Sequence, residues 1–308
     1  MISFKQRDII SILHFNKEEI LYILDVTKRM EQTDYSQILK GKVLSVLFFE
    51  PSTRTRLSFE AAMKRLGGMV IGFAESGATS IAKGESFSDS LKTIEGYCDV
   101  VVLRHYLEGA AQLASDIVNV PVINAGDGSN QHPTQTFLDL YTIQKTKGIL
   151  EGLKIGFLGD LKYGRTVHSL AYALAYFGTE MYFISPPNLR MPKDYMDELK
   201  KRRVTCHETE SLQGIGKQLD VIYCTRIQEE RFADPIEFEK VRGIYRLSKP
   251  MLEGLGVKDD LKIMHPLPRV DEMDEDLDGT NYAVYFDQVR NGVPVRKAIL
   301  ATVLGAIE

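Results

Sequence analysis

The stretch FFEPSTRTRLSFE, residues 48–60, places three hydroxyl side chains and two arginines at residues 52–56, between two apolar runs. The run before it, residues 43–49, is rich in β-branched and aromatic residues, which is typical of a buried strand. Apolar residues after it recur at mostly helical spacing until Gly67-Gly68. The polar cluster therefore lies where a strand passes into a helix.

Such a junction suits an anion. Backbone N–H groups at a helix start have no partner within the helix, and the helix dipole favours a negative charge beside them. Arg54 adds a planar, permanently charged group that matches phosphate oxygens, and Thr55 adds a hydroxyl. The cluster therefore predicts a phosphate site. A simpler alternative stays open, in which Ser52 or Thr53 caps the helix and the two arginines lie on a solvated face.

Length and composition predict a globular protein with two domains. The chain has 308 residues, of which 44% are hydrophobic and 26% are charged. Its net charge of −4 gives no basic field for nucleic acid, and no apolar run reaches the length of a membrane span. The three cysteines are far apart and form no CxxC pair, which indicates neither disulfides nor a zinc site. Together with a start unlike a signal peptide, this predicts a cytoplasmic protein without nucleic-acid or membrane partners.

Strand-like and helix-like segments alternate along the chain, which predicts an α/β fold of parallel sheets covered by helices. The pattern restarts near residues 148–152, so we expect one domain at residues 1–148 and a second at residues 149–290. The last segment, 291–308, is expected to be helical from residue 295 to 307 and to pack back on the first domain. The expected strands are residues 43–49, 69–73, 100–103, 121–124, 153–158, 181–184, 221–224 and 262–264.

Unusual polar residues follow most of these strands. In open α/β sheets, ligands bind beyond the carboxyl ends of the strands, so we expect these residues to form one active site in a cleft between the domains. The sets are Ser52 to Thr55, Arg104-His105, His132 to Gln135, Gly159 to Arg165, Arg226 to Gln228 and His265 to Arg269.

Other patterns carry less weight. Gly156, Gly159 and Gly164 follow a strand, but their spacing is not GxGxxG, and no GxxxxGK[ST] motif exists, which argues against nucleotide binding. The acidic run at residues 271–278 lacks a regular pattern of metal ligands, so we interpret it as a solvated loop. We expect neither a metal nor a cofactor.

Four motifs, in order along the chain, resemble those of the aspartate/ornithine carbamoyltransferase family. They are STRTR at 52–56, KGES at 83–86, HPTQ at 132–135 and HPLPR at 265–269, and the likeness continues to NGVPVRKAIL at 291–300. The resemblance implies an enzyme that transfers the carbamoyl group of carbamoyl phosphate to an amine, without a metal or a covalent enzyme intermediate.

Within this family, the chain resembles the members that use aspartate. Members that use ornithine typically carry HCLP and SMG motifs, whereas this chain has Pro266 in HPLPR and no SMG. Its RIQ at 226–228 is similar to an aspartate-binding segment, and arginines suit the two carboxylates of aspartate. The resemblance therefore implies N-carbamoyl-L-aspartate as the product, a step of de novo pyrimidine biosynthesis. Two alternatives remain: a carbamoyltransferase for ornithine or another amine, and an inactive paralogue that serves as a binding scaffold.

The resemblance also assigns roles to single residues. The phosphate of carbamoyl phosphate is held by Ser52, Thr53, Arg54 and Thr55, its carbonyl oxygen by Thr55, Arg104 and His132, and its NH2 group by Gln135 and the backbone carbonyls of Leu267 and Pro268. The catalytic residues in this set are Arg54, Thr55, Arg104 and His132. The aspartate-binding residues are Lys83, Arg165, Arg226 and Gln228.

The same resemblance implies partners. Ser80 and Lys83 are expected to reach the active site of a neighbouring subunit, within a homotrimer of catalytic chains. EGAA at residues 108–111 is similar to a surface that some relatives use to bind zinc-containing regulatory chains, although an ordinary helix start explains these four residues equally well.

Overall fold

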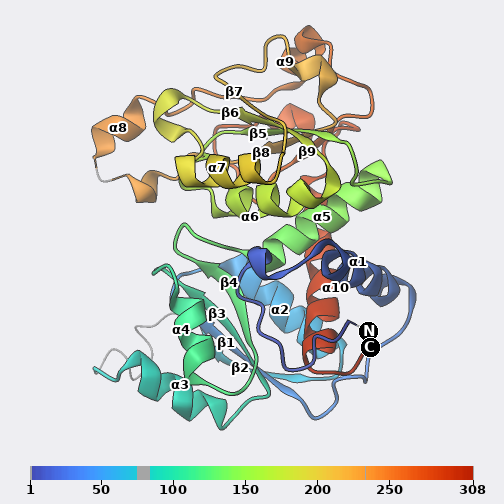
Figure 1. Cartoon of the computed structure of the whole chain (residues 1–308), viewed down its shortest axis with the longest axis vertical. Helices are drawn as coiled ribbons and strands as arrows, with labels where there is room; N and C mark the ends of the chain where they lie inside the picture. Colours follow the sequence, from blue (N-terminus) through green and yellow to red (C-terminus); the bar gives the residue numbers. More distant parts are fainter. Residues whose placement is uncertain (1, 75–83, 233, 308) are drawn as a thin grey trace. The chain divides into compact units, whose positions relative to one another are not determined.

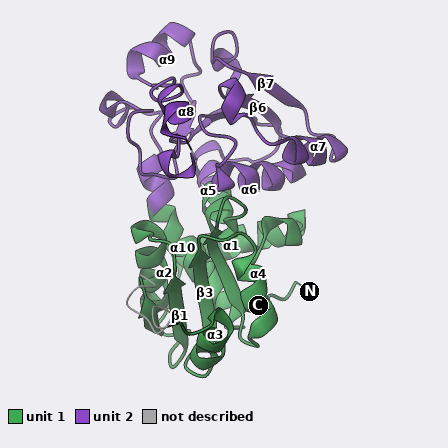
Figure 2. Ribbon diagram, turned by 90° about the vertical axis from the view of Figure 1, so that its left-hand side faces the viewer, with its two compact units in different colours: residues 1–141, 290–308 green, residues 142–289 purple. Residues whose placement is uncertain are grey.

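The computed structural model describes residues 2–74, 84–232 and 234–307. The chain forms two compact units, unit 1 with residues 1–141 and 290–308 and unit 2 with residues 142–289 (Figure 2). Each unit contains one parallel sheet. Within the described ranges, no helix is both long enough and apolar enough to cross a membrane.

Unit 1 is built around four parallel strands in the order β2-β1-β3-β4. β3 (Val100–His105) and β4 (Val122–Asp127) are buried along their whole length, and β1 (Val43–Phe48) is buried from its second residue onward. Such apolar runs are typical of parallel strands that helices cover on both faces. β2 (Met69–Phe73) forms an edge of the sheet, and three of its five residues are exposed.

Helices cover both faces of this sheet. α1 (Lys17–Gln32) begins with a capping box, in which the Asn16 side chain and the Glu19 side chain each accept a hydrogen bond from the other residue's backbone N–H. α5 (Pro133–Lys147) begins in unit 1, and its last residues belong to unit 2. Figure 1 shows α3 (Phe87–Glu95) and α4 (Ala110–Ile117) on one face, and α1, α2 (Thr53–Arg65) and α10 (Tyr285–Val303) on the other.

Unit 2 has five parallel strands in the order β7-β6-β5-β8-β9. The strands are β5 (Lys154–Leu158), β6 (Glu180–Ile184), β7 (Cys206–Thr209), β8 (Val221–Cys224) and β9 (Lys262–Met264). Figure 1 shows α6 (Arg165–Leu174) and α7 (Lys193–Lys201) on one face of this sheet and α9 (Lys249–Leu255) on the other, while the short α8 (Pro235–Glu239) lies to one side. Because the strands of each sheet are parallel, their carboxyl ends share one edge of that sheet.

The expected α/β architecture is confirmed, and each strand expected from the sequence is present, with bounds that differ by at most three residues. The pattern missed β7, a short edge strand whose two central residues, His207 and Glu208, are polar and exposed. The predicted start of the last helix is wrong, because α10 begins at Tyr285 and contains Pro294 in its interior. A proline normally lies near a helix start, since it has no N–H to donate, and the sequence therefore favoured a helix that begins after it.

Candidate functional site

The connection between β1 and α2 has the geometry of an anion site. Ser52 is extended (φ −159°, ψ 103°) and directly precedes the first turn of α2. In the described part of the chain its hydroxyl makes no capping hydrogen bond, while its carbonyl accepts the N–H of Arg56 at 3.2 Å. Simple capping by Ser52 is therefore not what the structure contains. The first amides of an α-helix have no partner within the helix itself, and the helix dipole favours an anion beside them.

The two arginines of this connection are arranged differently. Arg56 donates to the Glu60 carboxylate at 3.0 Å, one turn further along α2. Arg54, in the first turn, is exposed, whereas Thr55 beside it is buried, with 6% of its surface accessible. Arg54 is therefore the arginine that a ligand at the helix start can reach, whereas Thr55 lies in the buried part of the same helix turn.

Arg104 lies at the carboxyl end of β3 and is buried, with 9% of its surface exposed. Its Nη1 donates to the Ala125 carbonyl at 3.2 Å, and its Nη2 lies 3.4 Å from the Glu50 carboxylate. The backbone N–H of Phe49 donates to the Arg104 carbonyl at 2.8 Å. These contacts hold a buried positive charge beside the end of β1, where the Ser52 segment begins.

His132 and Gln135 flank the start of α5, and both are buried. Gln135 Nε2 donates to Asp139 Oδ1 at 2.9 Å, which orients the amide so that its oxygen is the atom that can accept from a ligand NH2 group. His132 Nδ1 is 3.5 Å from Thr134 Oγ1. Arg104, His132 and Gln135 all belong to unit 1, together with the start of α2.

Asp127 holds the loop before His132, and no sequence pattern indicated this role. Its carboxylate accepts hydrogen bonds from the backbone N–H groups of Gln131 at 3.1 Å and Gly109 at 2.9 Å, and from Asn124 Nδ2 at 2.9 Å. Asp127 is 1% exposed. A loop of Gly, Asp, Ser and Asn is typical of a solvated turn, so the sequence did not indicate that the Asp127 carboxylate is buried.

His105, which follows Arg104 at the end of β3, has a structural arrangement. Its Nδ1 accepts the backbone N–H of Leu107 at 2.9 Å, and its ring stacks on Tyr106 with centroids 4.4 Å apart. Burial lowers the pKa of His105, although nearby Glu50 and Asp127 oppose this change. A neutral, stacked imidazole suits the packing of this strand end.

In unit 2, Asp160 organises the loops that follow β5 and β8. One carboxylate oxygen accepts the backbone N–H groups of Lys162 at 3.2 Å and Tyr163 at 2.9 Å, and the other accepts that of Gln228 at 3.3 Å. Asp160 is completely buried, and burial raises its pKa while these backbone hydrogen bonds oppose the rise. Gln228 Nε2 in turn donates to the Tyr163 carbonyl at 3.1 Å.

Arg226 and Arg165 lie on these two loops. Arg226 follows β8, and its Nη1 donates to Glu230 Oε2 at 3.0 Å, in a pair that also includes Arg226 Nη2 and Glu230 Oε1. Burial raises the pKa of Glu230, but the hydrogen bonds from Arg226 outweigh this and bring it below its ordinary value. Arg165 is the first residue of α6, directly after Gly164. The structure thus brings Arg165, Arg226 and Gln228 to the carboxyl edge of the unit 2 sheet.

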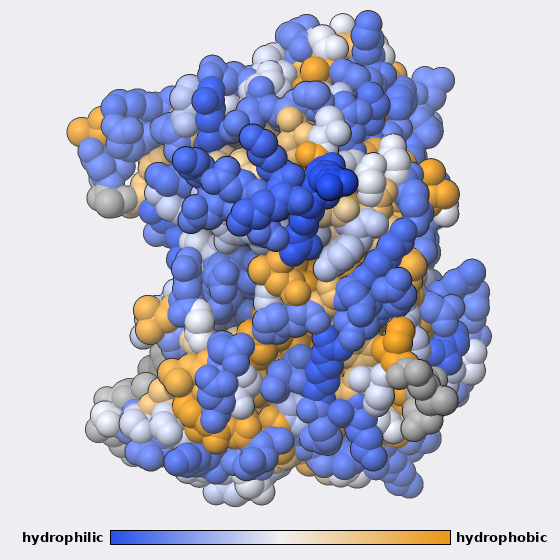
Figure 3. Space-filling view, in the orientation of Figure 1, coloured by the Kyte–Doolittle hydropathy of each residue, from blue (hydrophilic) through white to orange (hydrophobic). Residues whose placement is uncertain are grey.

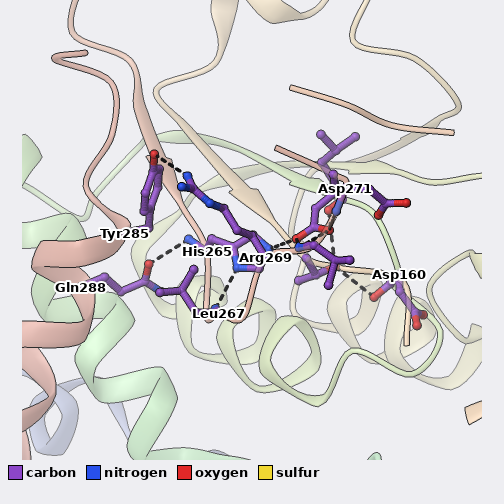
Figure 4. A network of polar contacts seen from close by, with 11 residues as sticks. Asp160, His265, Leu267, Arg269, Asp271, Tyr285 and Gln288 are labelled. Carbon is purple, nitrogen blue, oxygen red and sulfur yellow. Dashed lines mark hydrogen bonds and ion pairs between the residues drawn. The ribbon is translucent and has the colours of Figure 1, made fainter. Parts of the chain in front are cut away.

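The segment after β9 corrects one sequence interpretation. Within the acidic run 271–278, Glu272 is 4% exposed and lies 2.7 Å from His265 Nε2. Asp278 accepts a hydrogen bond from Arg269 Nη2 at 2.7 Å, and this bond lowers the pKa of Asp278. Figure 4 shows Arg269 directed to Tyr285, whose hydroxyl is 3.2 Å from Arg269 Nη1. The interpretation as a solvated loop therefore holds for most of the run, since Asp271, Glu275, Asp276 and Asp278 are exposed. It is wrong for Glu272, which is buried and pairs with the histidine of the HPLPR segment.

Leu267 and Pro268 lie in this HPLPR segment, directly after β9, and are joined by a cis peptide bond. Their backbone carbonyls are the atoms that the family resemblance assigns to the NH2 group of carbamoyl phosphate. Two further predicted residues, Ser80 and Lys83, lie outside the described residues.

Comparison with known proteins agrees with these motifs. A family model described as aspartate/ornithine carbamoyltransferase, carbamoyl-P binding domain, matches residues 7–145, and its Asp/Orn binding domain matches residues 151–303. The aspartate carbamoyltransferase catalytic subunit of Thermococcus onnurineus is 55% identical over 311 residues, which cover 100% of each chain. The catalytic subunit of M. jannaschii aspartate transcarbamoylase has a TM-score of 0.87 at 55% identity, over 95% of this chain and 96% of that one. Aspartate transcarbamoylase from Trypanosoma cruzi, solved in complex with carbamoyl phosphate and aspartate, has a TM-score of 0.93 at 36% identity, over 98% of each chain.

Proposed function

The chain belongs to the aspartate/ornithine carbamoyltransferase family, and we infer that it transfers the carbamoyl group of carbamoyl phosphate to the amino group of L-aspartate. The products are N-carbamoyl-L-aspartate and phosphate, and the reaction is a step of de novo pyrimidine biosynthesis. The observation that carries this inference is the start of α2, where the Ser52 hydroxyl makes no cap within the described chain and Arg54 is exposed beside it. Relatives of the same length are named for this reaction.

We assign carbamoyl phosphate to the first domain, residues 1–148 with the C-terminal segment 291–308. Ser52, Thr53, Arg54 and Thr55 hold its phosphate together with the amides of α2. Negative charge grows on the carbonyl oxygen as the amine attacks, and a preorganised positive group beside that oxygen stabilises the transition state. The residues for this role are Thr55, Arg104 and His132, and the buried, paired Arg104 supports it.

The NH2 group of carbamoyl phosphate needs acceptors. Gln135 offers its amide oxygen, because its nitrogen donates to Asp139 at 2.9 Å. The backbone carbonyls of Leu267 and Pro268 supply the other acceptors. These contacts orient the carbamoyl carbon toward the incoming amine, and such alignment contributes much of the acceleration in reactions between two bound molecules.

We assign L-aspartate to the second domain, residues 149–290. Arg165, Arg226 and Gln228 bind its two carboxylates, with Lys83. Arg226 supports this role because it already binds a carboxylate, that of Glu230, through both terminal nitrogens. The mechanism uses no covalent intermediate, because phosphate is a good leaving group, and the departing phosphate takes the proton from the attacking amine.

We further propose a homotrimer of catalytic chains, in which Ser80 and Lys83 act in the neighbouring subunit's site. The edge strand of unit 1 supports a contact between copies, because Met69 and Ile71 of β2 and Leu57 of α2 are large apolar side chains that are 55%, 39% and 49% exposed. The three free cysteines, Cys98, Cys206 and Cys224, support a cytoplasmic location.

A second exposed apolar set suits the proposed zinc-containing regulatory chains. Tyr106, Leu107 and Leu113, on the β3–α4 connection and α4, are each more than half exposed. Figure 3 shows hydrophobic residues gathered over this part of unit 1, on a face that is otherwise largely hydrophilic. The catalytic relatives are named as subunits, which supports an assembly with further chains.

The activity test is an assay with carbamoyl phosphate and either aspartate or ornithine. Formation of carbamoylaspartate without citrulline supports the proposal. Citrulline as the main product would favour the ornithine alternative, and no product with either amine, despite binding of carbamoyl phosphate, would favour the inactive scaffold.

The subunit arrangement has its own test. Arg54→Ala and Lys83→Ala chains are each expected to be nearly inactive alone and to rescue one another after they are unfolded and refolded together. With random equal mixing in a trimer, about three rings in four are mixed and each restores one site in three, so about a quarter of the sites should recover. No gain, despite mixed trimers, would confine each active site to one chain.

A further inference from the structure

The segment after β9 contains a histidine with both ring nitrogens engaged. His265 Nδ1 is 2.8 Å from the backbone nitrogen of Leu267, and His265 Nε2 is 2.7 Å from Glu272 Oε1. The backbone N–H of His265 donates to the Gln288 side chain at 2.8 Å, and Figure 4 shows His265 between Gln288 and Leu267. His265 is 1% exposed and Glu272 is 4% exposed. Both the ring and the backbone of His265 are therefore fixed.

The hydrogen-bond partners determine the tautomer of His265. A backbone N–H can only donate, so Nδ1 must accept from Leu267 and carries no proton. Nε2 then carries the proton and donates to Glu272. The buried carboxylate thus orients the ring and selects the tautomer that can accept from Leu267, as carboxylates behind functional histidines do elsewhere.

Leu267 needs such support. Its φ is +56°, in the left-handed region that residues with a Cβ rarely adopt. Non-glycine residues keep this conformation where surrounding contacts determine it, and such residues gather at functional sites. The hydrogen bond to His265 Nδ1 is a contact of this kind, and it fixes the peptide group whose neighbours carry the Leu267 and Pro268 carbonyls.

We propose that His265 is a positioning residue for the transfer reaction, and that with Glu272 it holds the Leu267 and Pro268 carbonyls in the direction required by the NH2 group of carbamoyl phosphate. This proposal rests on the proposed function, which assigns those carbonyls to that group. His265 acts through the backbone of Leu267 and itself touches no substrate.

The competing explanation is that the buried pair of His265 and Glu272 merely stabilises unit 2. The chain offers a matched control for a histidine–glutamate pair in the same unit. His207 Nε2, on β7, lies 2.8 Å from Glu180 Oε1, on β6, and these side chains are 47% and 28% exposed. His207 has no place in the proposed site, so His207→Asn reports the effect of breaking such a pair alone.

Three substitutions at position 265 separate the two explanations. His265→Ala removes the acceptor for the Leu267 N–H. His265→Asn retains it, because an asparagine oxygen accepts the N–H two residues further on, as in Asx-turns. His265→Gln has a longer side chain, whose amide is placed nearer to Glu272 and does not accept the Leu267 N–H. If the alanine variant does not fold, the comparison of the Asn and Gln variants still separates the positioning role from a purely structural one.

The readouts are KM for carbamoyl phosphate, kcat, and the inhibition constant of inorganic phosphate, which occupies the α2 start but has no NH2 group. We expect KM to rise about tenfold in His265→Ala and His265→Gln, as the loss of one or two hydrogen bonds would give, and to stay within about threefold of the wild type in His265→Asn. The inhibition constant of phosphate should stay within about twofold in every variant, and His207→Asn should match the wild type.

Two results would overturn the positioning role: an unchanged KM in His265→Ala, or phosphate inhibition that weakens in parallel with KM. If KM rises as much in His265→Asn as in His265→Ala, the hydrogen bond to Nδ1 does not explain the role of His265. If the wild-type protein does not use carbamoyl phosphate at all, the proposed function fails first. If it does, a wild-type KM in His265→Ala overturns the role of His265 alone.

Discussion

The start of α2 in unit 1 and the segment 226–230 in unit 2 both present an arginine to an anion, but they differ in the groups that surround the arginine. At the start of α2, the Ser52 hydroxyl makes no cap in the described chain and Arg54 is exposed. In unit 2, both terminal nitrogens of Arg226 bind the Glu230 carboxylate, and Gln228 donates to the Tyr163 carbonyl. The first region is built largely from backbone amides, and the second from side chains with protein partners.

The difference indicates separate contributions to the reaction. Backbone amides at a helix start are held in place before the ligand arrives, so they can act on charge that develops during transfer. In the proposed aspartate site, a carboxylate of the substrate would replace Glu230 on Arg226, and this exchange would change the affinity for aspartate. We therefore expect changes in the first region to lower kcat and changes in the second to raise KM for aspartate.

The largest expected effect is that of Arg54→Ala. Removal of a charged group beside the leaving phosphate takes away transition-state stabilisation of about 3 kcal/mol, so kcat should fall by about two orders of magnitude or more. Arg56→Ala is the matched control, because Arg56 is paired with Glu60 at 3.0 Å. It should change kcat by less than about threefold. Thermal melting shows whether both variants fold, and near-native turnover by a folded Arg54→Ala variant would refute the phosphate site.

A smaller effect is expected for Arg226→Ala. Loss of charge-assisted hydrogen bonds to a carboxylate costs about 1.5–3 kcal/mol, so KM for aspartate should rise by about one to two orders of magnitude. Inhibition by inorganic phosphate should not change, because the proposed phosphate site lies in the other region. Arg190→Ala, which breaks an exposed pair with Glu210, is the control in the same unit. Steady-state kinetics in both substrates would contradict the assignment if KM for aspartate stayed at the wild-type value.

The two regions also differ in how far the sequence predicted them. The hydroxyls and arginines of residues 52–56 follow one another along the chain, so a single strand–helix junction was enough to indicate a phosphate site. The sequence placed Asp160 only within the set 159–165 and Glu272 only within an acidic run, and it indicated no role for either carboxylate. Asp160 accepts the N–H of Gln228, 68 residues away in sequence. Glu272, which looks solvated within an acidic run, is buried in the fold and pairs with His265. Long-range burial leaves no local pattern.

The smallest expected effect concerns Asp160, which holds the loop of Gln228. Burial raises its pKa above the ordinary value of 3.8, so the folded state binds this proton more strongly than the unfolded state does. Stability of the wild type relative to Asp160→Asn should therefore increase as pH falls from above the folded pKa toward 3.8. Melting temperatures of both proteins between pH 7 and pH 4.5 should diverge by about 1–3 °C in favour of the wild type. Divergence in the opposite direction would mean that the hydrogen bonds from the backbone dominate and favour the carboxylate.

The central claim is that the two regions serve one reaction, with phosphate held at the start of α2 and aspartate held by Arg226 and its neighbours. The most direct test is calorimetric titration with N-(phosphonacetyl)-L-aspartate, a ligand with which the Trypanosoma cruzi relative has also been solved. This molecule joins both anionic parts, so it avoids a second loss of association entropy. We predict binding at least about a hundredfold tighter than that of carbamoyl phosphate, weakened by Arg54→Ala and by Arg226→Ala alike. Affinity no better than that of carbamoyl phosphate alone, or insensitivity to either substitution, would contradict the account.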